Sequence, residues 1–268
     1  MRKIITLLLL TLFPVLAGAL THEELMSLTP KPNVNVNGVG ILIYDGMNAL
    51  DAIGPYQVFK QAGLKTFLIA KDKNQLVVPG DNFDPATFQR QGMSIKAEKS
   101  ISEVSQLDIL LIPGGAIGTV EQTLSPETLA WIQAVDKTTL FTTSVCTGAW
   151  ILGQAGLLQG KQATTNWYRA KEFLQRYGAT YLPRRYVQDG KYITAAGVTA
   201  GTDMALYLVN KLFGVKDYTQ AVMLDLEYDP KPPIRGGSVK KTKRNVVDAM
   251  RAMYDWAFDT LTPGFRPQ

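Results

Sequence analysis

The single cysteine of the chain, Cys146, lies in a pattern that favours a reactive thiol. An apolar strand over residues 140–145 runs directly into Cys146, and a helix is predicted from Thr147 to about Ala155, closed by Gly156. This strand–turn–helix layout is typical of a nucleophile elbow, which presents one side chain at the carboxyl end of a sheet. Because the helix dipole favours a thiolate, we expect a lowered pKa for Cys146. The alternative is an inert, buried thiol.

A second candidate element is Pro113-Gly114-Gly115, which ends an apolar strand over residues 107–112. Two glycines let the backbone approach a ligand closely and direct N–H groups at it. The amides of Gly115 and Thr147 could therefore form an oxyanion hole. The alternative is a simple turn, because many strands end in such residues.

The third candidate is Asp51, between a predicted strand over residues 39–44 and a helix opened by Gly54-Pro55. It belongs to the same sheet edge as Cys146. A carboxyl group there could hydrogen-bond the thiolate or shuttle a proton. Taken alone, Asp51 is more typical of a helix cap than of a catalytic acid.

Histidine is almost absent, which narrows the possible chemistry. The only one, His22, lies near the N-terminus. A Ser-His-Asp triad and a Cys-His pair are therefore excluded from the core, and a His-based zinc site is disfavoured. With one cysteine, the chain cannot form an internal disulfide.

The elements that must position these residues alternate between strand and helix. Strands are predicted over 39–44, 66–70, 107–112 and 140–145, with a hairpin at 186–187 and 192–194; helices are predicted over 54–62, 126–136 (capped by Ser125), 147–155, 167–177 and 199–213. This order predicts one α/β domain with a mostly parallel sheet and helices on both faces. A Pro/Gly-rich loop over 229–238 precedes a predicted terminal helix over 243–259.

The N-terminus has the three-part layout of a secretory signal peptide. Arg2 and Lys3 precede an apolar run over 4–16, and Ala17-Gly18-Ala19 supplies a cleavage site. A membrane anchor is the alternative, but 13 residues are too few to span a bilayer, which takes about 20. We expect cleavage after Ala19 and an exported, periplasmic or secreted, protein with no stable membrane insertion.

The mature chain would then begin with a polar arm over residues 20–37. Loss of Arg2 and Lys3 leaves 26 basic and 23 acidic side chains, an excess too small to indicate nucleic-acid binding. The basic run over 240–244 is interpreted as a solvated helix start.

Taken together, these segments resemble the ThiJ/PfpI superfamily over residues 38–238, and within it the isonitrile hydratases. The resemblance is carried by LDAIGPYQVF (50–59), DILLIPGGAIG (108–118), TTSVCTGAWILGQAGLLQGKQATTNW (142–167), ITAAGVTAGTDMALYLV (193–209) and LDLEYDPKPP (224–233). It implies a flavodoxin-like three-layer sandwich, followed here by a C-terminal helical extension over 239–268.

The resemblance also implies roles for particular residues. Cys146 would be the catalytic cysteine, Thr147 its neighbouring threonine and Asp51 the acid of the first strand–helix connection. The implied reaction is thiolate attack on an isonitrile carbon, assisted by a proton from Asp51, after which water releases an N-substituted formamide. No metal or organic cofactor is implied, and a homodimer is expected.

One departure concerns Asn166, which stands where the family usually has histidine. Asparagine cannot take up a proton at neutral pH. Hydrolysis through a Cys-His pair, and glyoxalase- or amidase-like reactions that use this histidine, are therefore weaker hypotheses. A non-catalytic small-molecule-binding or thiol-sensing envelope protein stays open as the alternative to an enzyme.

Overall fold

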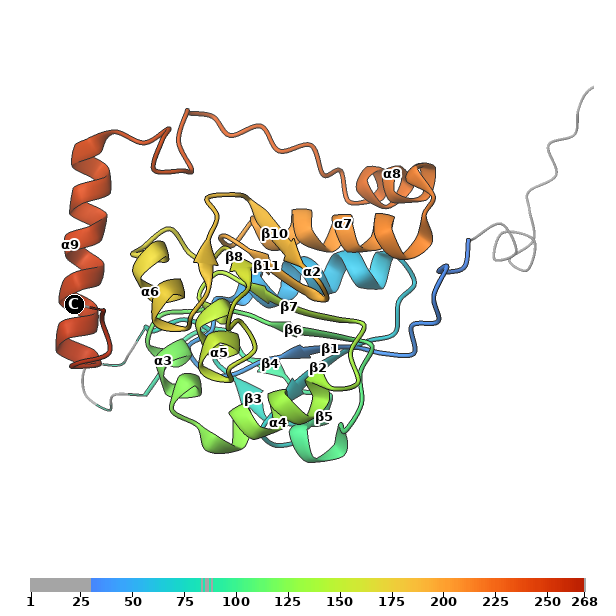
Figure 1. Ribbon diagram of the computed structural model, residues 1–268, viewed down its shortest axis with the longest axis horizontal. Coiled ribbons are helices and arrows are strands. Elements are labelled where there is room, and N and C mark those ends of the chain that lie inside the picture. Colours follow the sequence, from blue (N-terminus) through green and yellow to red (C-terminus); the bar gives the residue numbers. More distant parts are fainter. Residues whose placement is uncertain (1–29, 83, 85–86, 88, 268) are drawn as a thin grey trace, which may run out of the picture. The chain divides into compact units, whose positions relative to one another are not determined.

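The computed structural model describes residues 30–82, 84, 87 and 89–267 (Figure 1). The predicted signal peptide and residues 20–29 of the predicted arm lie outside the described residues. The strands are β1 Val39–Leu42, β2 Thr66–Ala70, β3 Leu76–Val77, β4 Ile95–Lys96, β5 Lys99–Ser100, β6 Ile109–Ile112, β7 Phe141–Val145, β8 Gln162–Ala163, β9 Thr180–Tyr181, β10 Tyr186–Asp189 and β11 Tyr192–Ala195. The helices are α2 Ala49–Gln61, α3 Ile117–Thr123, α4 Pro126–Asp136, α5 Gly148–Gln154, α6 Ala170–Arg176, α7 Ala200–Phe213, α8 Lys216–Asp225 and α9 Arg244–Leu261, with a 3-10 turn at Ile101–Glu103.

The described residues contain one large sheet, of strand order β10-β11-β7-β6-β1-β2-β5. All of its neighbouring strands are parallel except the β10–β11 hairpin. The apolar strands β1 and β6 are buried along their whole length, as expected for central strands covered on both faces. The predicted mostly parallel sheet is therefore confirmed, and β1, β6 and β7 are neighbours in it.

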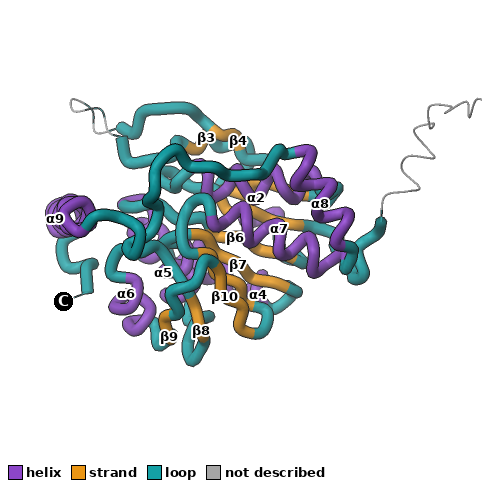
Figure 2. The backbone as a smooth tube through the Cα atoms, turned by 90° about the horizontal axis from the view of Figure 1, so that it is seen from above, coloured by secondary structure: helices purple, strands orange, loops and turns teal. Residues whose placement is uncertain are grey.

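Helices cover both faces of the sheet. Figure 1 shows α2 and α7 on one side of the strands and α3, α4 and α5 on the other, and Figure 2 shows α2 and α7 side by side across β6 and β7. Among the described residues, no helix combines the length and the apolar character needed to cross a bilayer. The long connection after α8 brings the chain to α9 at the far end of the sheet (Figure 1).

Helix α2 begins earlier than the sequence predicts. It starts at Ala49, capped by the Asn48 side chain, which accepts the Leu50 amide, so Pro55 lies inside the helix rather than at its start. The ring of Pro55 packs beside Gly201 of α7, a close approach that holds the two helices together. The prediction of a helix from Gly54 was wrong, and Asp51 therefore lies in the first helical turn instead of in a loop.

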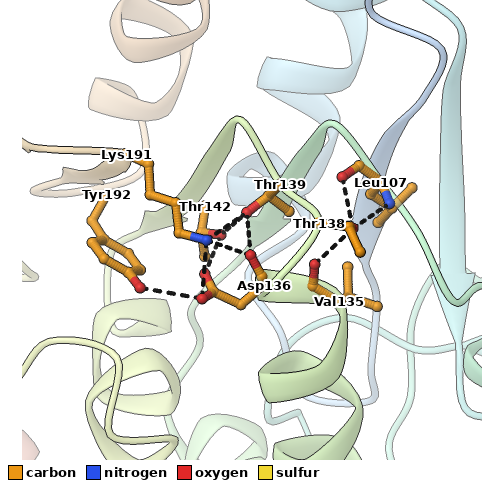
Figure 3. Close-up of polar contacts among 8 residues, drawn as sticks. All are labelled: Leu107, Val135, Asp136, Thr138, Thr139, Thr142, Lys191 and Tyr192. Atoms are coloured by element: carbon orange, nitrogen blue, oxygen red, sulfur yellow. Dashed lines mark hydrogen bonds and ion pairs between the residues drawn. The ribbon is translucent and has the colours of Figure 1, made fainter.

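A buried polar network fixes the opposite end of β7 and β11 (Figure 3). Asp136, at the end of α4, accepts hydrogen bonds from Thr142 at 2.6 Å and Tyr192 at 3.2 Å, and pairs with Lys191 at 3.1 Å. Thr142 is fully buried, so its hydroxyl depends on these partners. The network joins a helix end to two strand starts, far from the carboxyl edge that carries Cys146.

We expect Asp136→Ala to destabilise the protein by about 2–4 kcal/mol, because Lys191 loses its ion pair, and Tyr192 and the buried Thr142 lose a carboxylate acceptor. Urea unfolding measures this loss. Asp229→Ala is the matched control, since Asp229 pairs with Lys231 in an exposed position and should matter by less than about 0.5 kcal/mol. Equal midpoints for the two variants would show that the network contributes nothing.

Candidate active site

Cys146 lies on a sharp turn between β7 and α5 with a left-handed backbone, at φ +59°. Its amide donates to the Ala195 carbonyl at 3.0 Å, and its carbonyl accepts the Thr165 hydroxyl at 2.8 Å. A non-glycine residue in this region is strained and persists only where its surroundings hold it, as at functional sites. The geometry is that of the predicted nucleophile elbow.

Asp51 reaches the same place from α2. Its side chain is fully buried, and Oδ2 accepts the Gly114 amide at 3.0 Å, which ties the start of α2 to the loop after β6. The other oxygen, Oδ1, has no hydrogen-bond partner among the described residues. The ends of β1, β6 and β7 thus bring Asp51, Gly114 and Cys146 together, as predicted.

Burial dominates the ionisation of both groups. It raises the pKa of Asp51 to about 7. Hydrogen bonds from Gly114 and Cys146 lower this pKa, but their effect is smaller than that of burial. Burial also raises the pKa of the Cys146 thiol, and the Asp51 carboxylate raises it further. The predicted lowering of the thiol pKa was therefore wrong, because desolvation of the sulfur raises its pKa by more than the dipole of the short helix α5 lowers it. Asp51 is a group that can exchange a proton near neutral pH.

Asn166 is the side chain that contacts the sulfur directly. Its Nδ2 donates to Cys146 Sγ at 3.3 Å, while its Oδ1 accepts the Tyr168 amide at 2.9 Å. This second bond fixes which end of the amide faces the sulfur. Hydrogen bonds from Asn166 and from Thr147 lower the pKa of the thiol, opposing burial. Asn166 therefore stabilises a thiolate but cannot act as its base.

The predicted oxyanion donors have a different arrangement. The Gly115 amide donates to Thr147 Oγ1 at 2.8 Å, and that hydroxyl donates back to the Gly115 carbonyl at 2.8 Å. The Gly115 amide is thus occupied by Thr147 and does not face a substrate. Thr147 acts on the sulfur instead, because hydrogen bonding from it lowers the pKa of the Cys146 thiol.

The two glycines are required by close packing within the protein. A Cβ atom on Gly114 would lie 2.4 Å from the Thr147 nitrogen, and one on Gly115 would lie 2.2 Å from the Gly46 carbonyl oxygen. The sequence predicts that they let the backbone approach a ligand. They instead allow the loop after β6 to lie against the Cys146 turn and the loop after β1, which sets the position of the thiol.

A pocket of about 310 Å³ opens beside Cys146. It contains the predicted Gly115, Thr147 and Asn166, but also aromatic side chains that the sequence reasoning missed. Its lining comprises Gly46, Met47, Asn48, Gly80, Asp81, Gly115, Ala116, Cys146, Thr147, Trp150, Asn166, Tyr168, Val198, Tyr254 and Phe258. A small, mostly apolar molecule would fit above the sulfur. The described part of the chain holds no cluster of three or more potential metal ligands.

With this geometry in place, comparison with known proteins identifies the family. The sequence profile of the DJ-1/PfpI family matches residues 37–211. The chain belongs to the DJ-1/PfpI family. The predicted resemblance to ThiJ/PfpI proteins is thereby confirmed, and α9 lies beyond the matched segment.

Individual relatives agree with this membership. Isonitrile hydratase of Pseudomonas putida is 37% identical over 215 residues, covering 80% of this chain and 88% of the relative. A ThiJ/PfpI family protein from Pseudomonas syringae has a solved structure with a TM-score of 0.75 and 33% identity, covering 87% of this chain and 92% of that one. The HTH-type transcriptional regulator CdhR of Pseudomonas aeruginosa is 27% identical over 124 residues, 46% of this chain and 36% of the regulator. DJ-1/PfpI relatives thus include both an enzyme and a regulator, and the flavodoxin-like α/β fold is confirmed.

Proposed function

We propose that this DJ-1/PfpI protein is a cofactor-free enzyme that adds water to an isonitrile through Cys146. The observation that carries the proposal is the arrangement at the sulfur: a strained turn presents it to a pocket, with Asn166 donating to it and a buried Asp51 of raised pKa beside it. The similarity to the Pseudomonas putida isonitrile hydratase supports the same chemistry.

In the first step, the Cys146 sulfur forms a bond to the terminal carbon of R–N≡C. The Asp51 carboxylate takes the thiol proton and delivers it to that carbon, giving a thioformimidate, R–N=CH–S–Cys. A carboxyl group with a pKa of about 7 can do both, because it accepts and releases a proton at the working pH. Asn166 and Thr147 stabilise negative charge on the sulfur during the attack.

In the second step, water adds to the thioformimidate carbon. One proton of the water moves to the nitrogen, and the carbon–sulfur bond breaks as the carbonyl forms. The products are R–NH–CHO and the Cys146 thiolate, and the second water proton returns to the Cys146–Asp51 pair. The sum is R–N≡C plus water giving an N-substituted formamide, with no oxidant, metal or cofactor needed.

A second candidate is a binding or thiol-sensing protein of the cell envelope. The raised pKa of the Cys146 thiol and the absence of a histidine at position 166 favour it, because both limit catalysis. The regulator among the relatives is consistent with a binding role for this fold. Amide hydrolysis and glyoxalase-like chemistry are weaker candidates, since Asn166 replaces the base that they would use.

The deciding experiment incubates the purified protein with benzyl isonitrile in ¹⁸O-water and follows N-benzylformamide by NMR and mass spectrometry. We expect turnover with one ¹⁸O atom in the formyl group, because water supplies the oxygen. Saturable binding of the isonitrile without formamide would move the assignment to the second candidate.

We further propose that the protein is exported after cleavage behind Ala19 and that it acts as a homodimer. The charged start, the apolar run and the small residues of 1–19 support export. N-terminal sequencing of the protein recovered from the envelope fraction, and its sedimentation mass, test these two proposals separately from the chemistry.

A further inference from the structure

The C-terminal helix α9 supplies one wall of the Cys146 pocket. Tyr254 and Phe258 from this helix line the pocket together with Trp150 and Tyr168 from the domain. Phe258 is only 1% exposed, so this side of α9 is part of the folded protein rather than an appendage. Helix α9 follows the segment that the family profile matches.

Two kinds of contact hold α9 in place. Asp255 accepts the Tyr168 hydroxyl at 2.7 Å and pairs with Arg169 at 3.2 Å and Arg266 at 2.9 Å. The ring of Phe258 stacks on that of Tyr168, with centroids 5.6 Å apart. Aromatic contact and ion pairing on one helix face fix its position better than either would alone.

Further ring contacts extend this wall. Phe258 lies 5.9 Å from Trp150, and Tyr254 lies 5.0 Å from Tyr168 and 5.9 Å from Trp167, measured between centroids. Burial raises the pKa of Tyr254, and this residue lines the same pocket as Cys146. A molecule bound at Cys146 would therefore meet the four aromatic rings that line the pocket.

The remaining lining excludes some substrates. No lysine or arginine is among the described residues that line the pocket, and its one ionisable carboxylate outside the Cys146 centre is Asp81. An anionic substrate would lose its hydration there without gaining a cationic partner. An uncharged molecule with an apolar group would instead bury that group against aromatic rings.

We propose that α9 is the specificity wall of this enzyme: Tyr254 and Phe258 hold an uncharged aromatic or branched substituent of the substrate while its reactive carbon meets Cys146. The inference rests on the proposed function for the identity of the reactive group. The preference of the pocket for molecules of a given size and charge does not depend on that reaction. It can be measured from the rates at which different reagents alkylate the Cys146 thiol.

Cys146 is the only thiol in the chain, so its alkylation reports on this pocket alone. The probes are iodoacetamide, N-benzyliodoacetamide and iodoacetate, which share a reactive carbon but differ in apolar size and charge. We expect the wild-type protein to react fastest with the benzyl reagent and slowest with iodoacetate. In Tyr254→Ala, the preference for the benzyl reagent over iodoacetamide should fall about tenfold.

Three further variants sharpen the test. Tyr254→Phe keeps the ring and should keep the preference, and Phe258→Leu should reduce it. The matched control is Trp256→Ala, which removes an aromatic ring from the outer side of α9, 65% exposed, and should leave all three rates unchanged. An unchanged preference in folded Tyr254→Ala and Phe258→Leu would overturn the proposal. Should Tyr254→Ala fail to fold, Phe258→Leu and Tyr254→Phe still decide it.

Turnover separates this inference from the proposed function. Benzyl isonitrile and methyl isonitrile differ in the substituent that the wall would hold, and kcat/KM should favour the benzyl compound less in Tyr254→Ala. If no isonitrile is hydrated but the alkylation preference still depends on Tyr254, the proposed reaction fails and α9 stands as the wall of a binding site. If isonitriles are hydrated without any dependence on Tyr254 or Phe258, the proposed role of α9 is wrong and the proposed reaction is supported.

Discussion

Replacing Cys146 by serine lowers formamide production at least about a thousandfold, because the reaction needs a covalent bond from this atom. A serine hydroxyl ionises far less readily than a thiol, so the Asp51 carboxylate, which takes the thiol proton in the wild type, generates far less nucleophile from serine. The rate of formamide release by NMR, at equal concentrations of variant and wild-type protein, measures the loss.

The matched control is Ser144→Ala, two residues earlier on β7. Ser144 is fully buried, and its hydroxyl has no hydrogen-bond partner among the described residues, so its removal should leave turnover and unfolding unchanged. Both variants remove or alter one small buried group at the carboxyl end of β7. A Cys146→Ser protein that still produces formamide at the wild-type rate would rule out covalent catalysis at this position.

The sequence predicted the parts of the site that depend on strand ends. Apolar runs ending at Ile112 and Val145 are neighbouring parallel strands, so the residues after them must meet at one edge. The same reasoning brought Asp51 to Cys146 although its helix was placed too late. That error arose because Pro55 is well suited to a helix start, whereas Asn48 caps α2 two turns earlier.

Features that depend on burial and on long-range docking could not be predicted. The direction of the Cys146 pKa is set by how completely the fold removes water from the sulfur, and the sequence shows only the helix that follows it. Helix α9 was expected from its residues, but nothing in them indicates that Tyr254 and Phe258 pack on Trp150 and Tyr168. The Pro/Gly-rich connection before α9 does not determine where on the domain this helix packs.

Asp51→Asn separates the two roles that a carboxyl group can have beside a thiol. The asparagine oxygen can still accept the Gly114 amide, so the loop geometry should be kept. Turnover should fall about 10²- to 10⁴-fold, because the proton can no longer be passed to the isonitrile carbon. The thiol should meanwhile alkylate faster at pH 7, since the neighbouring negative charge that raises its pKa is gone.

Asn166→Ala is the opposite case: loss of its hydrogen bond should raise the thiol pKa and slow alkylation.

The pH dependence completes this argument. Below about pH 7 the Asp51 carboxyl group is protonated, and above it the carboxylate can take the thiol proton, so kcat/KM of the wild type should rise with pH through about 7. This apparent pKa belongs to the Cys146–Asp51 pair, and it should be absent from the Asp51→Asn profile. A wild-type profile without this rise, or an Asp51→Asn variant whose thiol becomes less reactive, would mean that Asp51 stabilises the thiolate as a protonated donor and does not accept its proton.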